Sequence, residues 1–413
     1  MKFSRALYLS AVFALASAPS SHASAQTADV IHWWTSGSES KAVKVFATEF
    51  EKRGGKWIDN AVVGGQPAQA LAMSRIAGGQ PPAALMWNIG VAVRKLAEQG
   101  ILTDLDAEAK AGGWADKIPP LIARNASYEG HFVAVPVDIH ADNWLWYSTK
   151  VLADAGVEPP KTFDEMIASA DKIKAKGYIP LAVGGEPWQQ ALLFRSVMVG
   201  VGGKPFYKKV MIDHDADAAA GPEMVKSFDM LRRLKPLTDE GMAGRKWNDT
   251  AMLVASDKAA FQIMGDWVKG EFKAAGLTPG KEFGCQLSPG NQDAYIMTVD
   301  VFVFPKTNDP DKQKGQQLLA NVMMDPEVQV AFNKEKGAIP PRLDADVGSL
   351  DMCSQLGKKV VSVQDNQLPN AALAMSADAE GQLGDLVAQF WSDPSMTSEE
   401  AAKSFSGIIA GDQ

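Results

Sequence analysis

Short apolar runs and amphipathic stretches alternate between residues 30 and 100, and this order constrains the fold more than any other feature of the chain. The pattern predicts three strands, each followed by a helix, at residues 30–34, 39–52, 57–63, 67–76 and 83–87, with the last helix ending at Gly100. Ser36 and Ser38 precede the first helix, where a serine can cap free backbone N–H groups. Strands that alternate with helices in this way form a mainly parallel sheet covered by helices, so we expect an α/β fold.

The alternation breaks near residue 130 and then restarts, which indicates a second α/β unit. We expect further strands at 132–137, 143–147, 179–182, 259–263 and 296–304, and a helical, Ala-rich stretch from Leu368 onward. At roughly 100–200 residues per domain, a chain of 413 residues is long enough for two or three domains. We therefore predict two α/β lobes joined by crossovers near 135–141 and 296–302. The N-terminal lobe is assigned residues 26–136 and 297–344, and the C-terminal lobe residues 137–296 and 345–413.

The first 25 residues have the composition of a signal peptide. Lys2 and Arg5 precede a largely apolar stretch at 6–16, and Ala23-Ser24-Ala25 is a small-x-small cleavage site, so Gln26 is expected to begin the mature chain. The apolar stretch is shorter than the roughly 20 residues that a membrane-spanning helix needs. The sequence therefore predicts an exported, soluble, periplasmic protein.

Charge and composition argue against several classes of partner and site. Cleavage lowers Lys plus Arg from 41 to 39 against 49 Asp plus Glu, which gives the mature chain a net charge of −10. A chain this acidic, with a pI near 5.3 and no Lys/Arg cluster, lacks the footprint of a nucleic-acid-binding protein. It has only five histidines and two cysteines, so neither a Cys/His metal site nor His-based catalysis is expected.

Export changes how the two cysteines are interpreted. Cys285 and Cys353 are the only pair available in an oxidising compartment, which favours a disulfide between them. Two separate buried thiols are the alternative.

The motifs of common enzyme classes are missing or incomplete. G-x-S-x-G, H-E-x-x-H and C-x-x-C do not occur. The glycine-rich segment at 200–205 has Pro205 where a phosphate loop needs Ser or Thr, and the acidic run at 213–217 is followed by Ala218 where a calcium loop needs Gly. We expect no cofactor and no metal, and we interpret the acidic run as a helix cap. Catalytic carboxylate pairs of the kind found in glycoside hydrolases have no reliable local spacing and stay open.

Indole and carboxylate side chains occur where the first predicted strand ends. Trp33 and Trp34 close that strand, and Glu39 lies in the first turn of the helix that follows. In open α/β sheets, ligands bind outside the carboxyl ends of the strands. The face of an indole ring can stack on the apolar C–H surface of a sugar, and a carboxylate can accept hydroxyl protons. Packing of these rings in the core is the alternative.

Later strand ends carry similar side chains. Asp300 is the one acid in an otherwise apolar strand, and Asp266-Trp267 repeats the pairing of an acid with an indole. A buried acid must be hydrogen-bonded or paired, so Asp300 is either an interior ion-pair partner or an acceptor for a ligand. We place Trp144 and Trp146 in the core. Further candidates at such positions are His140, Asn143, Trp188 and Lys336.

Five segments spread over nearly the whole mature chain carry a resemblance. They are His32-Trp33-Trp34-Thr35-Ser36-Gly37, Ile139-His140 with Asn143-Trp144-Leu145-Trp146, Gly184-Gly185-Glu186-Pro187-Trp188, Met264-Gly265-Asp266-Trp267, and Lys336-Gly337-Ala338-Ile339-Pro340 with Arg342. In this order they resemble the periplasmic sugar-binding proteins of ABC importers, in extracellular solute-binding protein family 1, and most closely its glucose/mannose-binding branch.

The resemblance implies a type II periplasmic binding fold, in which two hinged lobes with central mixed sheets close on one sugar in the cleft between them. It implies that Trp33, Trp34 and Glu39 stack on and hydrogen-bond the sugar. It also implies a disulfide between the two cysteines, and it matches three more positions to ligand contacts, which are Trp267, Asp300 and Lys336.

Two positions depart from the glucose-binding members. Asn88 stands where those proteins carry Lys, and Leu373 stands where they carry His. Both changes remove polar groups from the pocket, and a lost donor shifts sugar preference because unmatched hydroxyls are costly to bury. With Asn88 and His140 included, the predicted substrate-binding set therefore has eight residues, and its ligand is described as a sugar rather than as glucose.

The sequence thus predicts a monomeric, non-catalytic protein that captures a glucose- or mannose-like monosaccharide and delivers it to an ABC transporter permease. Two alternatives stay open. One is a secreted glycoside hydrolase that uses two of Glu39, Asp266 and Asp300 as catalytic acids. The other is a binding protein for a polyol or another non-sugar solute.

Overall fold

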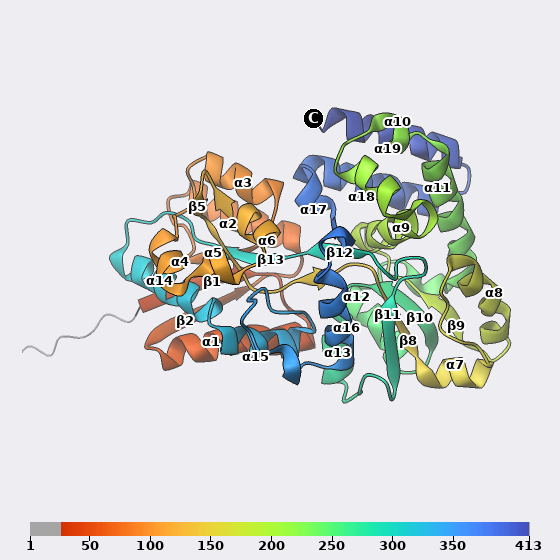
Figure 1. The fold of residues 1–413 in the computed structure, drawn as a ribbon, viewed down its shortest axis with the longest axis horizontal. Helices are drawn as coiled ribbons and strands as arrows, with labels where there is room; N and C mark the ends of the chain where they lie inside the picture. The colour runs from red at the N-terminus through yellow and green to blue at the C-terminus, as the bar shows by residue number, and fades with distance from the viewer. Residues whose placement is uncertain (1–25, 413) are drawn as a thin grey trace, which may run out of the picture.

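A computed structural model describes residues 26–412, which form two α/β bodies lying side by side (Figure 1). The predicted signal peptide at 1–25 lies outside the described residues. None of the helices within 26–412 has both the length and the apolar character that a membrane crossing requires.

The first body is built on a five-stranded mixed sheet with the strand order β2-β1-β3-β13-β6. β1 is parallel to β2 and β3, whereas β13 is antiparallel to β3 and β6. The strand-helix order predicted for the first hundred residues is confirmed. The strands are β1 (Gln26–His32), β2 (Gly55–Ala61), β3 (Ala84–Asn88), β6 (Ala134–Pro136) and β13 (Asp300–Val303). The helices packed around them include α1 (Gly37–Lys52), α2 (Gly65–Ala77), α3 (Val91–Glu98), α14 (Pro310–Met323) and α15 (Pro326–Lys336).

The second body is built on a four-stranded sheet with the order β11-β8-β10-β9. Trp144 and Trp146 on β8 are buried and stacked with their ring centroids 5.6 Å apart, which confirms their predicted place in the core. The strands are β8 (Trp144–Ser148), β9 (Ile179–Ala182), β10 (Ala259–Met264) and β11 (Phe283–Leu287). Its helices include α7 (Thr149–Ala155), α8 (Phe163–Lys174), α9 (Pro187–Met211), α11 (Pro222–Leu234), α12 (Trp247–Ala255), α13 (Val268–Ala274), α16 (Met352–Val361), α18 (Ala377–Ser392) and α19 (Ser398–Gly411).

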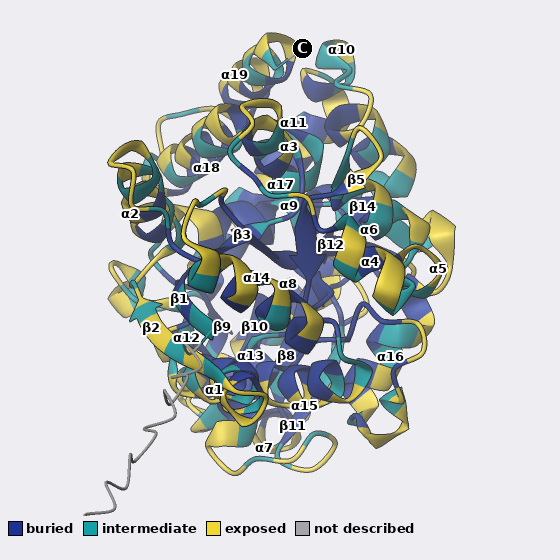
Figure 2. Cartoon of the chain, turned by 90° about the vertical axis from the view of Figure 1, so that its left-hand side faces the viewer, coloured by how far each residue is buried: buried dark blue, intermediate teal, exposed yellow. Residues whose placement is uncertain are grey.

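A small three-stranded sheet lies between the two bodies, made of β14 (Gln367–Pro369), β12 (Tyr295–Thr298) and β7 (His140–Ala141). The chain leaves the five-stranded sheet after β6 to enter β7, and it returns to that sheet when β12 gives way to β13. The lobe boundaries assigned from the sequence remain a prediction. The buried strands β3 and β12 are dark blue in the interior of Figure 2, and exposed positions follow the outer helix faces.

The single strand predicted at 296–304 is wrong. β12 and β13 are separate strands that pair in different sheets, and only Val299 lies between them. Both strands are completely buried, so their composition is apolar on either side of the break. An apolar run of this kind gives no local signal for where a strand changes its partners.

The predicted end of the first strand is also wrong. β1 ends at His32, so Trp33 and Trp34 follow the strand instead of closing it. The ring of Trp34 packs in the core, with its centroid 5.6 Å from that of Phe302 and 5.2 Å from that of Phe332. Aromatic side chains therefore fill the turn that leads into α1, where β-propensity alone would extend the strand.

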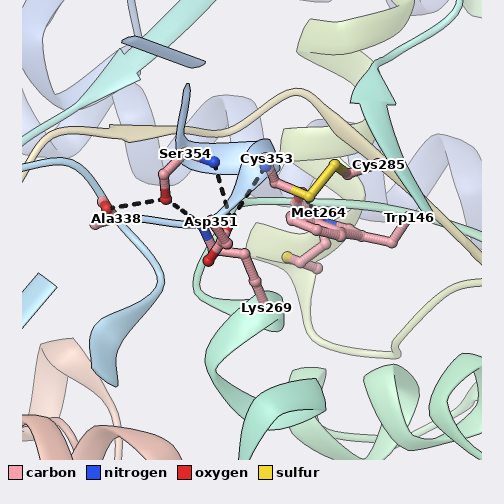
Figure 3. The surroundings of a disulfide bond; sticks show 8 residues. All are labelled: Trp146, Met264, Lys269, Cys285, Ala338, Asp351, Cys353 and Ser354. Atoms are coloured by element: carbon pink, nitrogen blue, oxygen red, sulfur yellow. Dashed lines mark hydrogen bonds and ion pairs between the residues drawn. A yellow bond between two sulfur atoms is a disulfide. The ribbon is translucent and has the colours of Figure 1, made fainter. Parts of the chain in front are cut away.

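The disulfide between Cys285 and Cys353 is confirmed, with the two Cα atoms 6.0 Å apart (Figure 3). It joins β11 to α16. Beside it, the ammonium of Lys269 contacts Ser354 and donates to Asp351 Oδ1 over 3.0 Å, so a partly buried ion pair and a covalent bond together fix α16 against the second body.

Candidate ligand-binding site

Six buried ionisable side chains gather where the two bodies meet. None of them is more than 6% exposed, although burying a charge is costly unless the charge is paired. They come from elements of both bodies: Glu39 from α1, Asp138 from the crossover before β7, His140 from β7, Asp266 from the end of β10, Asp300 from the start of β13 and Lys336 from the end of α15.

His140 lies at the centre of this buried cluster. Its Nδ1 is hydrogen-bonded to Asp266, and its Nε2 lies 3.2 Å from Asp138 Oδ2 and 3.7 Å from Asp300 Oδ2. Burial alone would lower the pKa of the imidazole, but the charges of Asp138 and Asp266 raise the pKa to about 10. At neutral pH the ring is therefore a buried cation, hydrogen-bonded through Nδ1 and flanked by the carboxylates of Asp138 and Asp300 at Nε2.

Asp300 is held from two directions. Asn88 Nδ2 donates to its Oδ1 over 2.7 Å, and its backbone N–H donates to Asp138 Oδ1 over 2.9 Å. Burial and the neighbouring carboxylate of Asp138 raise the pKa of Asp300 far above its usual value, even though His140 and Lys336 lower it. The environment of Asp300 thus favours the protonated form, in which the carboxyl group can donate a hydrogen bond.

Lys336 supplies the second cation. Its Nζ lies 3.4 Å from Glu39 Oε1, and 5.4 Å and 5.9 Å from the ring centroids of Trp34 and Trp267. Burial lowers the pKa of Lys336, but the carboxylates of Glu39 and Asp300 outweigh this effect and raise it. The ammonium is therefore held by carboxylates on one side and by indole rings of both bodies on the other.

Glu39 has a structural task as well. Ser36 caps α1 by accepting from the Glu39 backbone N–H, and Glu39 Oε2 accepts in return from the Ser36 backbone N–H over 3.3 Å. This capping box confirms the serine cap predicted for the first helix. It fixes the rotamer of Glu39, so that Oε1 is left to face Lys336.

Trp267 is the partly exposed ring of the site. Its edge packs against His140, with the centroids 5.2 Å apart and the planes at 84°. A side chain at position 265 would collide with the Trp267 ring, because an added Cβ would lie 2.2 Å from it. Gly337, with φ +93°, ends α15, and a Cβ at this position would lie 2.6 Å from the Asp266 carbonyl oxygen, so Gly337 allows α15 to approach the backbone of Asp266.

The structure brings together most of the predicted substrate-binding residues. The members joined by direct contacts are Trp34, Glu39, Asn88, His140, Trp267, Asp300 and Lys336. The ring of Trp33 lies beside Gly65 at the start of α2. That any of these residues contacts a sugar remains a prediction.

The sequence analysis missed two parts of this region. Asp138 is a lone acid that follows an apolar strand, which is the signal that singled out Asp300, and it could have been found in the same way. The other is the carboxylate of Glu271 on α13, whose Oε1 accepts from the backbone N–H and the hydroxyl of Ser38 over 3.0 Å and 2.5 Å. No local pattern indicates that contact, because 233 residues separate its partners.

Asp138, His140 and Asp300 also place one potential metal-ligand atom each within 4.8 Å of one another. The same acids already face the imidazolium of His140 and the ammonium of Lys336. His140 and Lys336 therefore offset part of the negative charge of the four carboxylates in this cluster.

Buried charges and indole rings converge where the two α/β bodies meet. Residues 34–330 match the family of bacterial extracellular solute-binding proteins, and the chain belongs to this family. The membership predicted from the five sequence segments is confirmed.

Individual relatives point in the same direction. The chain is 39% identical to a "probable sugar-binding periplasmic protein" of Brucella melitensis, over 82% of this chain and 79% of that protein. It is 37% identical to a protein of the same description from Rhizobium meliloti, over 84% of each. The structure is similar to that of maltose-bound MalE3 of T. maritima, with a TM-score of 0.79 and 18% identity over 93% of this chain and 99% of that one. The fold is the predicted type II periplasmic binding fold.

Proposed function

We propose that this protein captures a sugar in the periplasm and delivers it to the permease of an ABC transporter, without changing the sugar chemically. The observation that carries the proposal is the convergence of Trp267 with the buried acids and Lys336 at the junction of the two bodies. Sugars combine apolar C–H faces with a rim of hydroxyls, and both kinds of group are matched here.

The geometry supports different binding roles for the indole ring and for the carboxyl groups. The ring of Trp267 would stack on the sugar, and Glu39 and Asp300 would exchange hydrogen bonds with its hydroxyls. Each hydrogen bond to a charged group is worth about 1.5–3 kcal/mol. Three such bonds and one stacked ring would reach the ~8 kcal/mol of a micromolar ligand, which suits a glucose- or mannose-like monosaccharide.

A ligand in this site would contact residues of both bodies, which would favour their closure around it. Trp267 and Asp266 belong to the second body, whereas Glu39, Asp300 and Lys336 belong to the first. A ligand that binds both sets stabilises the closed arrangement over the open one by the free energy of the contacts it makes only there. The closed form of a monomer would then be the species that docks on the permease. Delivery to a transporter and a periplasmic location are also supported by the descriptions of the relatives.

A thermal-shift screen of the mature protein against hexoses, pentoses, polyols and carboxylic acids tests this function. A true ligand at a hundredfold excess over its dissociation constant stabilises the protein by ~2.7 kcal/mol, and we expect a neutral sugar to do so. Stabilisation by a polyol or an acid alone would refute the sugar assignment. The mature protein incubated with aryl glycosides and oligosaccharides should release no product. Steady turnover would instead favour the alternative function, a glycoside hydrolase.

A further inference from the structure

Helix α13 of the second body lies against the two helices of the first body that carry Glu39 and Lys336 (Figure 1). It begins directly after Trp267 and contacts the N-terminal end of α1 and the C-terminal end of α15. Helix ends have backbone groups without a partner in their own helix, and they carry a partial charge that is positive at the N-terminus and negative at the C-terminus. The side chains that α13 presents to these two ends therefore bear on how the bodies close.

A carboxylate of α13 faces the N-terminal end of α1. Glu271 Oε1 accepts from the backbone N–H of Ser38 over 3.0 Å and from the Ser38 hydroxyl over 2.5 Å. Ser38 is 2% exposed and Glu271 is 8% exposed, so little water reaches this contact while the bodies are together. Because Ser38 directly precedes Glu39, the contact holds the turn of α1 that carries Glu39.

An ammonium of the same helix faces the C-terminal end of α15. Lys273 Nζ donates to the backbone carbonyl of Lys334, in the last turn of α15, over 2.6 Å. Between the two contacts, Gly270 lies so close to both helices that an added Cβ would be 2.9 Å from Ser38 Oγ and 2.9 Å from the Glu335 carbonyl oxygen. Helix α13 thus places an acid at the positive end of one helix and a base at the negative end of the other.

We propose that Glu271 and Lys273 form a clip that holds α1 and α15 against the second body, and that both are positioning residues for sugar capture that do not contact the sugar. This inference rests on the proposed function, because the clip acts on a sugar held between the bodies. When the bodies separate, water replaces both contacts, so the clip does not affect the entry of a sugar into the open form. In the closed form, loss of the Glu271 carboxylate leaves the N–H and hydroxyl of Ser38 buried without this acceptor, which destabilises closure. The clip therefore sets how long a sugar is retained.

Stopped-flow tryptophan fluorescence of the mature protein with D-glucose, D-mannose, D-galactose and D-xylose tests the clip. For each sugar that the wild type binds, we expect E271A to raise the dissociation rate constant about tenfold and to leave the association rate constant within about twofold. E271Q keeps an oxygen acceptor for Ser38 and should show a smaller increase. K273A removes a contact at the exposed surface and should raise the dissociation rate constant about two- to threefold. The matched control is E223A/K226A, which removes one exposed acid and one exposed lysine of α11 and should bind each sugar as the wild type does.

The outcomes separate the clip from the proposed function. If the wild type binds a sugar and E271A releases it no faster than E223A/K226A, or if E271A weakens binding only through slower association, the clip is refuted and the proposed function stands. Should E271A fail to fold, E271Q and K273A provide the same test, and unchanged dissociation in both refutes the clip. If the wild type binds no sugar, either here or in the thermal-shift screen, the proposed function is refuted and the clip with it.

Discussion

Replacing Lys336 by methionine tests how the buried charges of the site are balanced. The Lys336 Nζ lies 3.4 Å from Glu39 Oε1, and both side chains are almost fully buried. At an effective dielectric constant of about 20, two unit charges at that distance attract each other by about 5 kcal/mol. Removing one partner of a buried pair costs roughly 3–5 kcal/mol, because the other charge stays buried and unpaired. We therefore expect K336M to lose about 3–5 kcal/mol of unfolding free energy.

A double-mutant cycle isolates the pair from the rest of the cluster. E39Q removes the negative charge and keeps the shape, so E39Q/K336M should lose clearly less stability than the sum of the two single losses. The measurement is urea unfolding at pH 7, followed by tryptophan fluorescence. K41M is the matched control, since Lys41 is exposed on α1, and its effect should stay within about 0.5 kcal/mol. A K336M variant as stable as K41M, or a coupling near zero, would refute the reasoning that these charges depend on each other.

Three further predictions concern stability. The Cys285–Cys353 bond closes a loop of sequence separation 68, so C285S/C353S should lose about 4 kcal/mol against the oxidised wild type in urea, and a loss below 1 kcal/mol would contradict this. The raised pKa of about 10 at His140 means that its stabilisation is complete below about pH 6.5 and is lost as the pH rises through 10. H140Q should therefore show a flatter decline of unfolding free energy between pH 7 and 10, and an unchanged slope would argue against a protonated ring. Trp34 is 1% exposed, so W34A should cost about 3–5 kcal/mol in the same urea assay, whereas a cost under 1 kcal/mol would place the ring outside the core.

Local patterns were sufficient to predict the first three strands and their helices. There, each apolar face repeats with the period of its own element, as in α1, where Val43, Phe46 and Phe50 share one buried face. The break at Val299 could not be predicted, because β12 and β13 are both buried on all sides and read as one apolar run. What separates them is their pairing with different sheets, which is a property of the tertiary structure.

In the candidate site too, single residues could be selected from the sequence, whereas their contacts could not be predicted. Asp300 and Trp267 could be selected because a lone acid or an indole at a strand end is unusual for a core. Their partners could not be assigned, since the contact of Asp300 with Asn88 joins residues 212 positions apart. Asp138 carries the same local signal, a lone acid after an apolar strand, but its contacts with Asp300 and His140 form only when the crossover is in place.

The kind of contact that joins the two bodies bears on how the protein can work. Glu271 on α13 accepts from the N-terminus of α1 at Ser38, and His140 and Lys336 sit between carboxylates of both bodies. Such charged groups regain their hydration when the two bodies separate. Separating the bodies at these contacts therefore costs less free energy than separating an apolar interface of equal area. For the same reason, bringing the two bodies together without a ligand gains little free energy. Under the proposed function, a sugar would offer hydroxyls and an apolar face to the same groups, and these added contacts would favour the closed arrangement of the two bodies.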